Sequence, residues 1–546
     1  MIVGCGDNHS IDPDGPPPVT YVLQLQVGGN GSGVVTSAPA GLTCAAGACS
    51  AELAEGTQVT LAASASAGAF LGWSGDCSGQ GACTVTMDRD RSVGALFGAP
   101  GAALWVKQLG GADRDYGRSI AVDSNGDLIA VGAFRGTIAA GPAGAELVSA
   151  GGYDVYVQKL DGMTGAVQWA RRVGGAADDH VAGVAVDGAD NAYVLGSFQG
   201  EVDLGGGPLA PTGPTAVFVL ALDPDGGYRW ARKLDGTNLG AGAGGIASGG
   251  GAAVAVVGSY QGSLTVDATT FTSAGASDLF AVELTAAAGA TLWARSFGGA
   301  GRDLASGVAL DGAGNAVLTG MFEGAIDFGG GVLAAPTALN GYVLKLARGG
   351  GGYVLARQLV GPKVSQGAAV AIDLAGNVLV TGSFQGSLSL GCGAGLSASQ
   401  PGQDDVFLAK LSPAGACTWA KAFGGAADGA GASPPRAASA VAVNSAGDVA
   451  IAGAFCGSLS LGGPTLASAS ACPATNAFAA RLAGDGAHRR SIRAGGGSGA
   501  FAGGVAQAAD GRVFVTGDFS GLAEFGGTAL TSSGPTDAFI AAFAPQ

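Results

Sequence analysis

The stretch Asn191-Ala-Tyr-Val-Leu-Gly-Ser-Phe-Gln-Gly200 is one of several related copies in this chain. Its closing pattern, Gly-x-aromatic-x-Gly, occurs seven times: at Gly132–Gly136, Gly196–Gly200, Gly258–Gly262, Gly320–Gly324, Gly382–Gly386, Gly453–Gly457 and Gly517–Gly521. Successive copies begin 62 to 71 residues apart. A fixed period is typical of propellers and solenoids. The sequence therefore predicts seven copies of one β unit, although the pattern does not identify a ligand.

Each copy contains four short stretches with strand character. Gly183–Asp187 is followed by a turn and by the strand Ala192–Phe198, and a third strand such as Asp405–Leu411 comes after a longer connection. The fourth strand carries Trp-Ala-Arg or a variant of it, with these residues at the tryptophan position: Trp169, Trp230, Trp293, Leu355, Trp419 and Arg490. Four strands per repeat of this length predict a propeller blade. We expect the tryptophans to pack between blades; a sugar-stacking platform is the alternative.

The repeat region begins and ends at different strands of its repeat unit, and each end supplies a strand that the other end lacks. It opens with an isolated fourth strand, Ala103–Leu109, and closes with a third strand, Asp537–Phe543. Pairing these two strands would complete the last blade and close a ring, which removes the exposed edges of an open sheet. The prediction is an all-β, seven-bladed β-propeller over residues 103–546, closed by its N-terminal strand.

The repeats resemble a known family, the seven-bladed bacterial β-propeller repeat called the SBBP repeat. The resemblance rests on Gly-Val-Ala-Val-Asp, Gly-Asn, Gly-Ser-Phe-x-Gly and Asp-x-Phe-Val-x-Lys-Leu. The third and seventh copies depart from it, with Ser248 and Ala508 at the position of Asp187, and Arg490 replaces a tryptophan. The resemblance implies an architecture but no reaction.

Residues 21–98 precede the repeats and predict a small β domain. Strand character is found in Tyr21–Val27, Gln58–Ala62, Ala69–Trp73 and Cys83–Met87. The segments Gly56-Thr-Gln-Val-Thr-Leu-Ala62 and Phe70-Leu-Gly-Trp-Ser-Gly-Asp-Cys77, with Cys83–Met87, resemble the divergent InlB-type bacterial repeat of exported proteins. That resemblance implies a surface spacer or adhesion unit and brings no catalytic residue.

Eight of the nine cysteines are expected to form disulfides. Cys44/Cys49 and Cys77/Cys83 each close a short loop, a constraint worth about 2 kcal/mol to a domain with a small core. A four-cysteine zinc site is the alternative, although the spacings are wider than the usual pairs. In the repeats, Cys392/Cys417 and Cys456/Cys472 would pair within single blades, but the sequence leaves their connectivity open.

The ninth cysteine, Cys5, lies in a different context. Met1-Ile2-Val3-Gly4-Cys5 resembles the end of a bacterial lipoprotein signal, in which the cysteine becomes lipid-modified, although the charged and apolar regions that normally precede it are missing. Either translation begins further upstream or Cys5 is an ordinary cysteine. Residues 1–20, which end in the Pro16-Pro17-Pro18 spacer, would then link a lipid anchor to the folded part.

Composition excludes several classes of protein. The 546 residues include 103 glycines and only 12% charged residues, yet 47% are hydrophobic and no Gly-X-Y period is present, so neither collagen nor disorder fits. The net charge of −15 argues against a nucleic-acid partner or an anionic membrane surface. The longest uncharged run, Leu239–Tyr260, falls on repeat strands and does not predict a membrane helix.

Acidic residues gather in the loops after the fourth strands: Asp113, Asp115, Asp178, Asp179, Asp303 and Asp428. Turn capping is the simplest interpretation, calcium binding by Asp115, Asp179 and Asp303 is the second, and acid/base catalysis is the third. His180 is the one histidine in these loops and has no second ligand beside it. We find no nucleophile elbow, P-loop, dinucleotide fingerprint or quinone-cofactor pocket in the sequence, and we expect no cofactor apart from calcium.

These observations predict an exported, lipid-anchored, monomeric protein of the cell envelope or cell surface. We expect a binding or scaffold protein that uses the propeller's loop face for a ligand, a glycan or a partner protein. It would contact the membrane only through the lipid anchor. The alternative is an exported propeller enzyme, similar to a lyase or a glycosidase, that uses loop carboxylates. An acid/base pair at the channel mouth would favour the enzyme, and scattered carboxylates would favour binding.

Overall fold

The protein is described here from a computed structural model, which covers residues 19–545 except 30, 40, 78–80, 99–102, 240–242, 250–251, 427–435 and 470–471. Cys5 therefore lies outside the described residues. The chain divides into two compact units, Met1–Ala99 and Pro100–Gln546. In the described residues both units are built from β-strands, with one short 3-10 helix, η1 (Pro142–Gly144). The predicted all-β class is confirmed.

The first unit packs two four-stranded sheets face to face. One has the order β4 (Gly47–Ala54), β1 (Thr20–Gly28), β8 (Arg91–Gly98), β6 (Ala69–Gly75), and the other β3 (Thr43–Cys44), β2 (Ser32–Ala38), β5 (Gln58–Ala67), β7 (Cys83–Thr86). Alternate residues of these strands, among them Leu23, Val59 and Trp73, form one buried core. Cys44–Cys49 and Cys77–Cys83 are disulfides, as expected.

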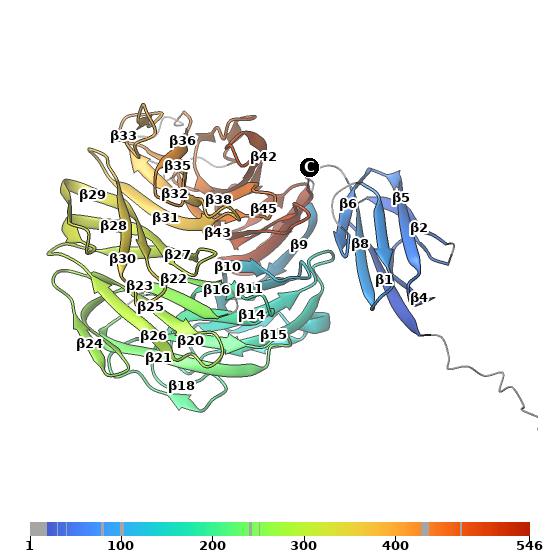
Figure 1. The fold of residues 1–546 in the computed structure, drawn as a ribbon, viewed down its shortest axis with the longest axis horizontal. Helices are drawn as coiled ribbons and strands as arrows, with labels where there is room; N and C mark the ends of the chain where they lie inside the picture. The colour runs from blue at the N-terminus through green and yellow to red at the C-terminus, as the bar shows by residue number, and fades with distance from the viewer. Residues whose placement is uncertain are drawn as a thin grey trace, which may run out of the picture. The chain divides into compact units, whose positions relative to one another are not determined.

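The second unit contains seven sets of four antiparallel strands, which we number as blades in chain order (Figure 1). The strands of each blade are given from the innermost strand outward. Blade 1 contains β10 (Tyr116–Val122), β11 (Leu128–Phe134), β14 (Asp154–Leu160) and β15 (Val167–Val173), and blade 2 contains β16 (Asp179–Val186), β17 (Ala192–Phe198), β20 (Ala216–Leu222) and β21 (Tyr228–Asn238). Blade 3 contains β22 (Ala243–Gly249), β23 (Ala253–Val266), β25 (Asp278–Thr285) and β26 (Thr291–Phe297), and blade 4 contains β27 (Leu304–Leu310), β28 (Ala316–Asp327), β29 (Val332–Leu346) and β30 (Tyr353–Leu359). They continue, in blade 5, with β31 (Ser365–Ile372), β32 (Val378–Gln385), β35 (Asp404–Leu411) and β36 (Cys417–Phe423); in blade 6, with β37 (Ala437–Val443), β38 (Val449–Phe455), β41 (Asn476–Leu482) and β42 (His488–Gly495); and in blade 7, with β43 (Ala500–Gln507), β44 (Val513–Phe519), β47 (Asp537–Phe543) and β9 (Ala103–Leu109).

A hairpin fills the long connection between the second and third strands of each blade. In blade 4 it is formed by the extended ends of β28 and β29, and in blade 3 by the end of β23 with β24 (Thr269–Thr272). The others are β12 (Thr137–Ala139) with β13 (Glu146–Val148), β18 (Val202–Asp203) with β19 (Pro208–Leu209), β33 (Ser387–Leu388) with β34 (Leu396–Ser397), β39 (Ser458–Leu459) with β40 (Leu466–Ala467), and β45 (Leu522–Phe525) with β46 (Thr528–Thr531).

The ring closes as the ends of the repeat region predict. Strand β9 pairs with β47, so that Trp105 lies opposite Ala542 and Gln108 opposite Phe539. Gln108 also donates a hydrogen bond to Asp537 across this seam. The innermost strands contact one another in cyclic order, with β10 touching both β16 and β43. The buried clusters join facing sheets of neighbouring blades, for example Val131 of blade 1 with Val194 of blade 2.

The two disulfides of this unit lie within single blades. Cys392, in the hairpin of blade 5, is bonded to Cys417 at the start of β36, and Cys456 is bonded to Cys472 at the other end of the same connection in blade 6. Each therefore fixes a long connection to its own blade, as expected. Closing a loop of about 25 residues is worth about 3 kcal/mol in the chain-entropy model.

A glycine near the end of each fourth strand, inside β21 in blade 2 and just after the strand in the others, brings neighbouring blades into close contact. A Cβ on any of these glycines would clash with a backbone carbonyl oxygen in the hairpin of the next blade, at these pairs: Gly111 with Thr137, Gly175 with Glu201, Gly236 with Ser263, Gly299 with Ala325, Gly361 with Ser387, Gly425 with Ser458 and Gly496 with Leu522. All seven junctions of the described propeller have this contact. Glycine is required there because the backbones approach too closely for any side chain.

The repeated tryptophans form a second contact between blades, through the turn that joins the third and fourth strands. Each indole Nε1–H donates to a carbonyl in that turn of the next blade, at 2.9 to 3.3 Å: Trp105 to Gly162, Trp169 to Pro224, Trp230 to Ala286, Trp293 to Arg348 and Trp419 to Gly484. Left-handed glycines such as Gly165 and Gly226 lie against the indoles. The interpretation of these tryptophans as packing between blades is thus confirmed.

The repeated lysine of the third strand has a role inside the blade. Lys159, Lys345 and Lys410 form ion pairs of 2.8 to 2.9 Å with the aspartates of the first hairpin of their blades, Asp123, Asp311 and Asp373. For Asp311, burial acts to raise the pKa, but hydrogen bonds from Lys345 and Asn315 outweigh it and lower the pKa to about 2. These pairs tie the third strand to the turn between the first two strands.

We predict that Gly299→Ala destabilises the propeller by about 1–3 kcal/mol, because the new methyl group must displace the Ala325 carbonyl. Gly312→Ala is the matched control, since a Cβ at Gly312 meets nothing within 4 Å. That variant should change the unfolding free energy by less than about 1 kcal/mol. Thermal or denaturant unfolding measures both. Equal stabilities of the two variants would contradict the proposed contact.

We predict that Trp230→Ala lowers the unfolding free energy by about 3–5 kcal/mol, because the indole is 7% exposed and fills the junction between blades 2 and 3. Trp230→Phe keeps most of the packing but removes the indole donor, which leaves the Ala286 carbonyl only the longer 3.3 Å bond from the Tyr193 hydroxyl, so it should lose about 0.5–1.5 kcal/mol. Denaturant titration of the two variants separates the packing from the hydrogen bond. If Trp230→Ala unfolds at the same denaturant concentration as the wild type, the contact of Trp230 with blade 3 does not stabilise the propeller.

Candidate functional site

The three aspartates predicted as calcium ligands lie at three different blade junctions. Asp115, Asp179 and Asp303 are at most 1% exposed. Their carboxylates accept the backbone N–H of the junction glycines Gly111, Gly175 and Gly299 at 2.6 to 2.8 Å. The carboxylates therefore hold the close glycine contacts in place, which agrees with the capping interpretation.

A second aspartate of the preceding blade accompanies each of these three. Asp537 lies near Asp115, Asp154 near Asp179, and Asp278 near Asp303. At the junction of blades 5 and 6 the equivalent pair is Asp405 and Arg436, which form a fully buried ion pair of 3.3 Å. The same place in the fold thus holds two carboxyl groups at three junctions and opposite charges at another.

Burial raises the pKa of three junction aspartates, Asp115, Asp179 and Asp303. Burial, with the neighbouring Asp154 carboxylate, raises the pKa of Asp179 to about 7, although the Gly175 N–H acts in the opposite direction. Burial likewise raises the pKa of Asp115 and of Asp303 to about 6. Because two adjacent buried carboxylates repel each other, the junction is most favourable when one carries a proton.

No group of three or more His, Cys, Asp or Glu in the described part of the chain is arranged to hold a metal ion. Asp178 accepts the N–H of Tyr153 at 3.0 Å, and Asp113 lies against Gly136. Asp428 lies outside the described residues. Since calcium takes six to eight oxygen ligands, two carboxylates at a junction would supply only part of a site. The structure therefore brings these acids into pairs, but not together at one place.

The inner strands enclose a central channel of about 840 Å³. Each inner strand has a register shift that leaves one residue out of the pairing. These seven residues, which we call the bulge ring, all line the channel: Arg118, Ala182, Gly244, Ser306, Ala368, Ser439 and Gly503. A β-bulge re-aims a side chain, and bulges are common beside functional sites.

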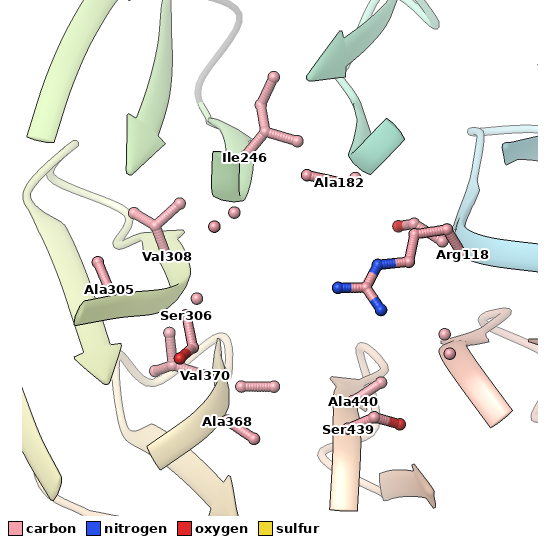
Figure 2. Close-up of a pocket in the computed structure, with 18 of the residues that line it drawn as sticks. Arg118, Ala182, Ile246, Ala305, Ser306, Val308, Ala368, Val370, Ser439 and Ala440 are labelled. Atoms are coloured by element: carbon pink, nitrogen blue, oxygen red, sulfur yellow. The ribbon is translucent and has the colours of Figure 1, made fainter. Parts of the chain in front are cut away.

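Arg118 is the exception in the bulge ring, since the other six residues are Ala, Gly or Ser. Figure 2 shows its guanidinium extending into the open space, while Ala182, Ser306, Ala368 and Ser439 end near the channel wall. The guanidinium has no hydrogen bond or ion pair within 4 Å among the described residues. Most of the other lining residues are small or apolar, with Arg302, Gln261 and Gln366 as further polar members, and no aspartate or glutamate lines the channel in the described part of the chain.

A second cavity of about 320 Å³ lies at the mouth of the channel, where blades 7, 1 and 2 meet, and Arg118 lines both cavities. We call the second cavity the mouth site. Its polar side chains come from the starts of inner strands and the ends of second strands, so it opens on the face with the long connections. They are Tyr116, Arg118, His180, Ser197 and Asp518.

Asp518 gives the mouth site its one carboxylate among the described lining residues. Burial raises the pKa of Asp518 to about 6, and the charge of Arg118 acts against this rise. Burial also lowers the pKa of Arg118 from its usual value, while Asp518 acts to raise it. The two residues thus interact electrostatically across the seam between blades 7 and 1.

Aromatic rings continue from the mouth site at the junction of blades 1 and 2. The ring centroids of Tyr116 and Tyr153 are 5.8 Å apart, and those of Tyr153 and His180 are 5.7 Å apart. Burial, with a hydrogen bond to Tyr116, raises the pKa of Tyr153 to about 12. The charges of Arg114 and Arg135 also act on Tyr153. We call Tyr116, Tyr153 and His180 the aromatic strip.

Reasoning from the sequence singled out His180 but missed Arg118 and Asp518. The sequence feature that could have indicated these two residues is that they differ from the residues at the same positions of the other repeats. Asp518 follows the first glycine of its Gly-x-aromatic-x-Gly pattern, where other copies have Ala133, Ser197, Ser259, Met321, Ser383 and Ala454. Repeated residues maintain the fold, so a charged residue present in only one copy indicates a role that the fold does not require.

The junction carboxyl groups give a prediction about pH. Because the pKa of Asp179 is raised in the folded protein to about 7, its contribution to stability is present below about pH 4 and is lost as the pH rises through about 7. Asp179→Asn keeps an oxygen acceptor but cannot ionise, so its melting temperature should fall less between pH 5 and 8 than that of the wild type. Scanning calorimetry across that range checks this, and parallel curves would contradict it.

Two family models match parts of the chain. Residues 23–100 match the divergent InlB B-repeat domain, and residues 104–129 match the β-propeller repeat SBBP. A curated relative, the uncharacterized WD repeat-containing protein L264 of Acanthamoeba polyphaga mimivirus, is 24% identical over 162 residues. That match covers 24% of this chain and only 12% of the relative.

Similar solved structures cover 81% of this chain at low identity. They include BamB from Moraxella catarrhalis (13% identical, 99% of that chain covered, TM-score 0.33) and the quinohemoprotein alcohol dehydrogenase from Comamonas testosteroni (12% identical, 76% covered, TM-score 0.36). Similarity at this level carries no inference about a ligand or a reaction. The chain thus contains a segment similar to the divergent InlB B-repeat domain, followed by a β-propeller of which residues 104–129 match the SBBP repeat.

Proposed function

We propose that this protein is a binding protein of the cell envelope that holds a saccharide at the mouth site. The observation that supports this most is the departure from repeat symmetry at one place. Arg118 and Asp518 replace small or uncharged residues of the other blades, and both line the mouth site. Convergent polar groups in a concave site are typical of ligand recognition.

The aromatic strip supports a saccharide rather than a wholly apolar ligand. Sugars present C–H faces to aromatic rings and hydroxyl groups to polar side chains. Tyr116 and His180 offer ring surface within the mouth site, and Ser197, Asp518 and Arg118 offer donors and acceptors. A cavity of about 320 Å³ lies within the ~300–1,000 Å³ usual for small-ligand sites.

Several observations support a location in the cell envelope. Four disulfides form within the described residues, as in proteins of oxidising compartments. The InlB-type repeat is typical of surface proteins. No helix in the described ranges is long and apolar enough to span a bilayer. We propose that lipid modification of Cys5 provides the anchor, and mass spectrometry of the protein purified from its own membranes would test this.

A lyase is the second candidate function, because His180, Tyr116 and Arg118 line one cavity. In such a reaction a base removes the proton next to a uronate carboxylate, the bond from C4 to the leaving oxygen breaks, and that oxygen receives a proton. A two-carboxylate glycosidase is less well supported, since Asp518 is the one carboxylate among the described residues that line the mouth site. The unsaturated product of a lyase absorbs ultraviolet light, so incubation with uronate oligomers distinguishes catalysis from binding.

We predict that His180→Ala weakens saccharide binding by about tenfold, because the exposed imidazole belongs to both the mouth site and the aromatic strip. His488→Ala in β42 is the matched control: the same substitution, at a residue outside the mouth site, should leave the affinity unchanged. Isothermal titration with galactotriose and tri-galacturonate measures both. If neither saccharide binds the wild-type protein, the proposed function is wrong.

A further inference from the structure

The bulge ring gives seven equivalent positions around one channel, and the fold itself needs only a small residue at each. Alanine occupies the bulge in blades 2 and 5, glycine in blades 3 and 7, and serine in blades 4 and 6. Arg118 in blade 1 therefore adds a long cationic side chain that packing does not require.

The surroundings of Arg118 leave its charge uncompensated at close range. Asp518 influences it electrostatically, but the two side chains do not form an ion pair within 4 Å among the described contacts. Arg302, the second cation of the channel lining, instead has a partner, Glu323, at 3.6 Å. A guanidinium in a partly desolvated space is stabilised when a counter-charge occupies the space in front of it.

Two further arginines lie near the mouth site. Arg114 and Arg135 are exposed beside the aromatic strip, and both act on Tyr153 as positive charges. Carboxylates accompany them, since Asp178 accepts the Tyr153 N–H and Asp113 lies against Gly136. Arg118 is therefore the one cation that lines the mouth site among the described residues, and it is the group that an anionic ligand would meet there.

We infer that the saccharide bound at the mouth site is acidic, and that its carboxylate or sulfate group enters the channel and pairs with the Arg118 guanidinium. This rests on the proposed function, because the aromatic strip must hold the sugar ring beside the channel. The planar guanidinium donates two parallel N–H bonds to such an oxyanion. Asp518 remains beside Arg118 as a positioning residue and accepts a sugar hydroxyl.

The test compares one acidic and one neutral ligand of the same length. Wild-type protein should bind tri-galacturonate about tenfold or more tightly than galactotriose, and added sodium chloride should reduce the difference. In Arg118→Ala the two affinities should become equal, while galactotriose binding is retained. This variant is expected to fold, because alanine occupies the same bulge in blades 2 and 5. Arg302→Ala, which removes the other channel arginine, is the matched control and should keep the preference.

The outcomes separate this inference from the proposed function. Equal binding of both trisaccharides to wild-type protein overturns the inference but leaves the mouth site as a saccharide site. A preference for tri-galacturonate that survives in Arg118→Ala also overturns it, because the arginine would then play no part. Competition by inorganic sulfate in wild type but not in Arg118→Ala supports an oxyanion site. Absence of binding by either trisaccharide overturns both proposals.

Discussion

The fold depends on the close approach of backbones at the blade junctions. At each of the seven described junctions a glycine lies against a carbonyl oxygen of the next blade, where no side chain could fit. A tryptophan clamp adds a hydrogen bond at five of the same junctions. The pairing of β9 with β47 completes a ring in which all seven described junctions share the glycine contact.

The junctions also account for three of the six loop acids, Asp115, Asp179 and Asp303. A carboxylate that accepts the N–H of a junction glycine fixes the glycine in its close contact. Burial of two such groups together raises the pKa of Asp179 to about 7 and makes the junction sensitive to pH near neutrality. The ion pair of Asp405 and Arg436 avoids this repulsion at another junction. The acids are thus structural first, and calcium binding by Asp115, Asp179 and Asp303 stays a prediction.

The residues that differ from the other repeats are the best indication of function in this protein. Residues that recur have structural contacts: the lysines of the third strands form ion pairs within their blades, and the tryptophans of the fourth strands bond to the next blade. Arg118 and Asp518 have no equivalents and meet at the seam of the ring. A symmetric scaffold offers seven similar positions, so a unique charge at one of them is evidence for a ligand rather than for packing.

The sequence by itself determined the all-β class and the closure of the ring, because the repeat period and the complementary end strands can be read directly from the order of the residues. It left the pairing of the four propeller cysteines open, and the structure shows the bonds Cys392–Cys417 and Cys456–Cys472. Strands Ala192–Phe198, Ala103–Leu109 and Asp537–Phe543 have the predicted bounds. Only the tertiary structure decided where the charged groups meet. Asp179 and Asp154 are 25 residues apart and Arg118 and Asp518 are 400 apart, and no spacing rule brings either pair together. Their proximity results from the closed ring, which places the last blade beside the first.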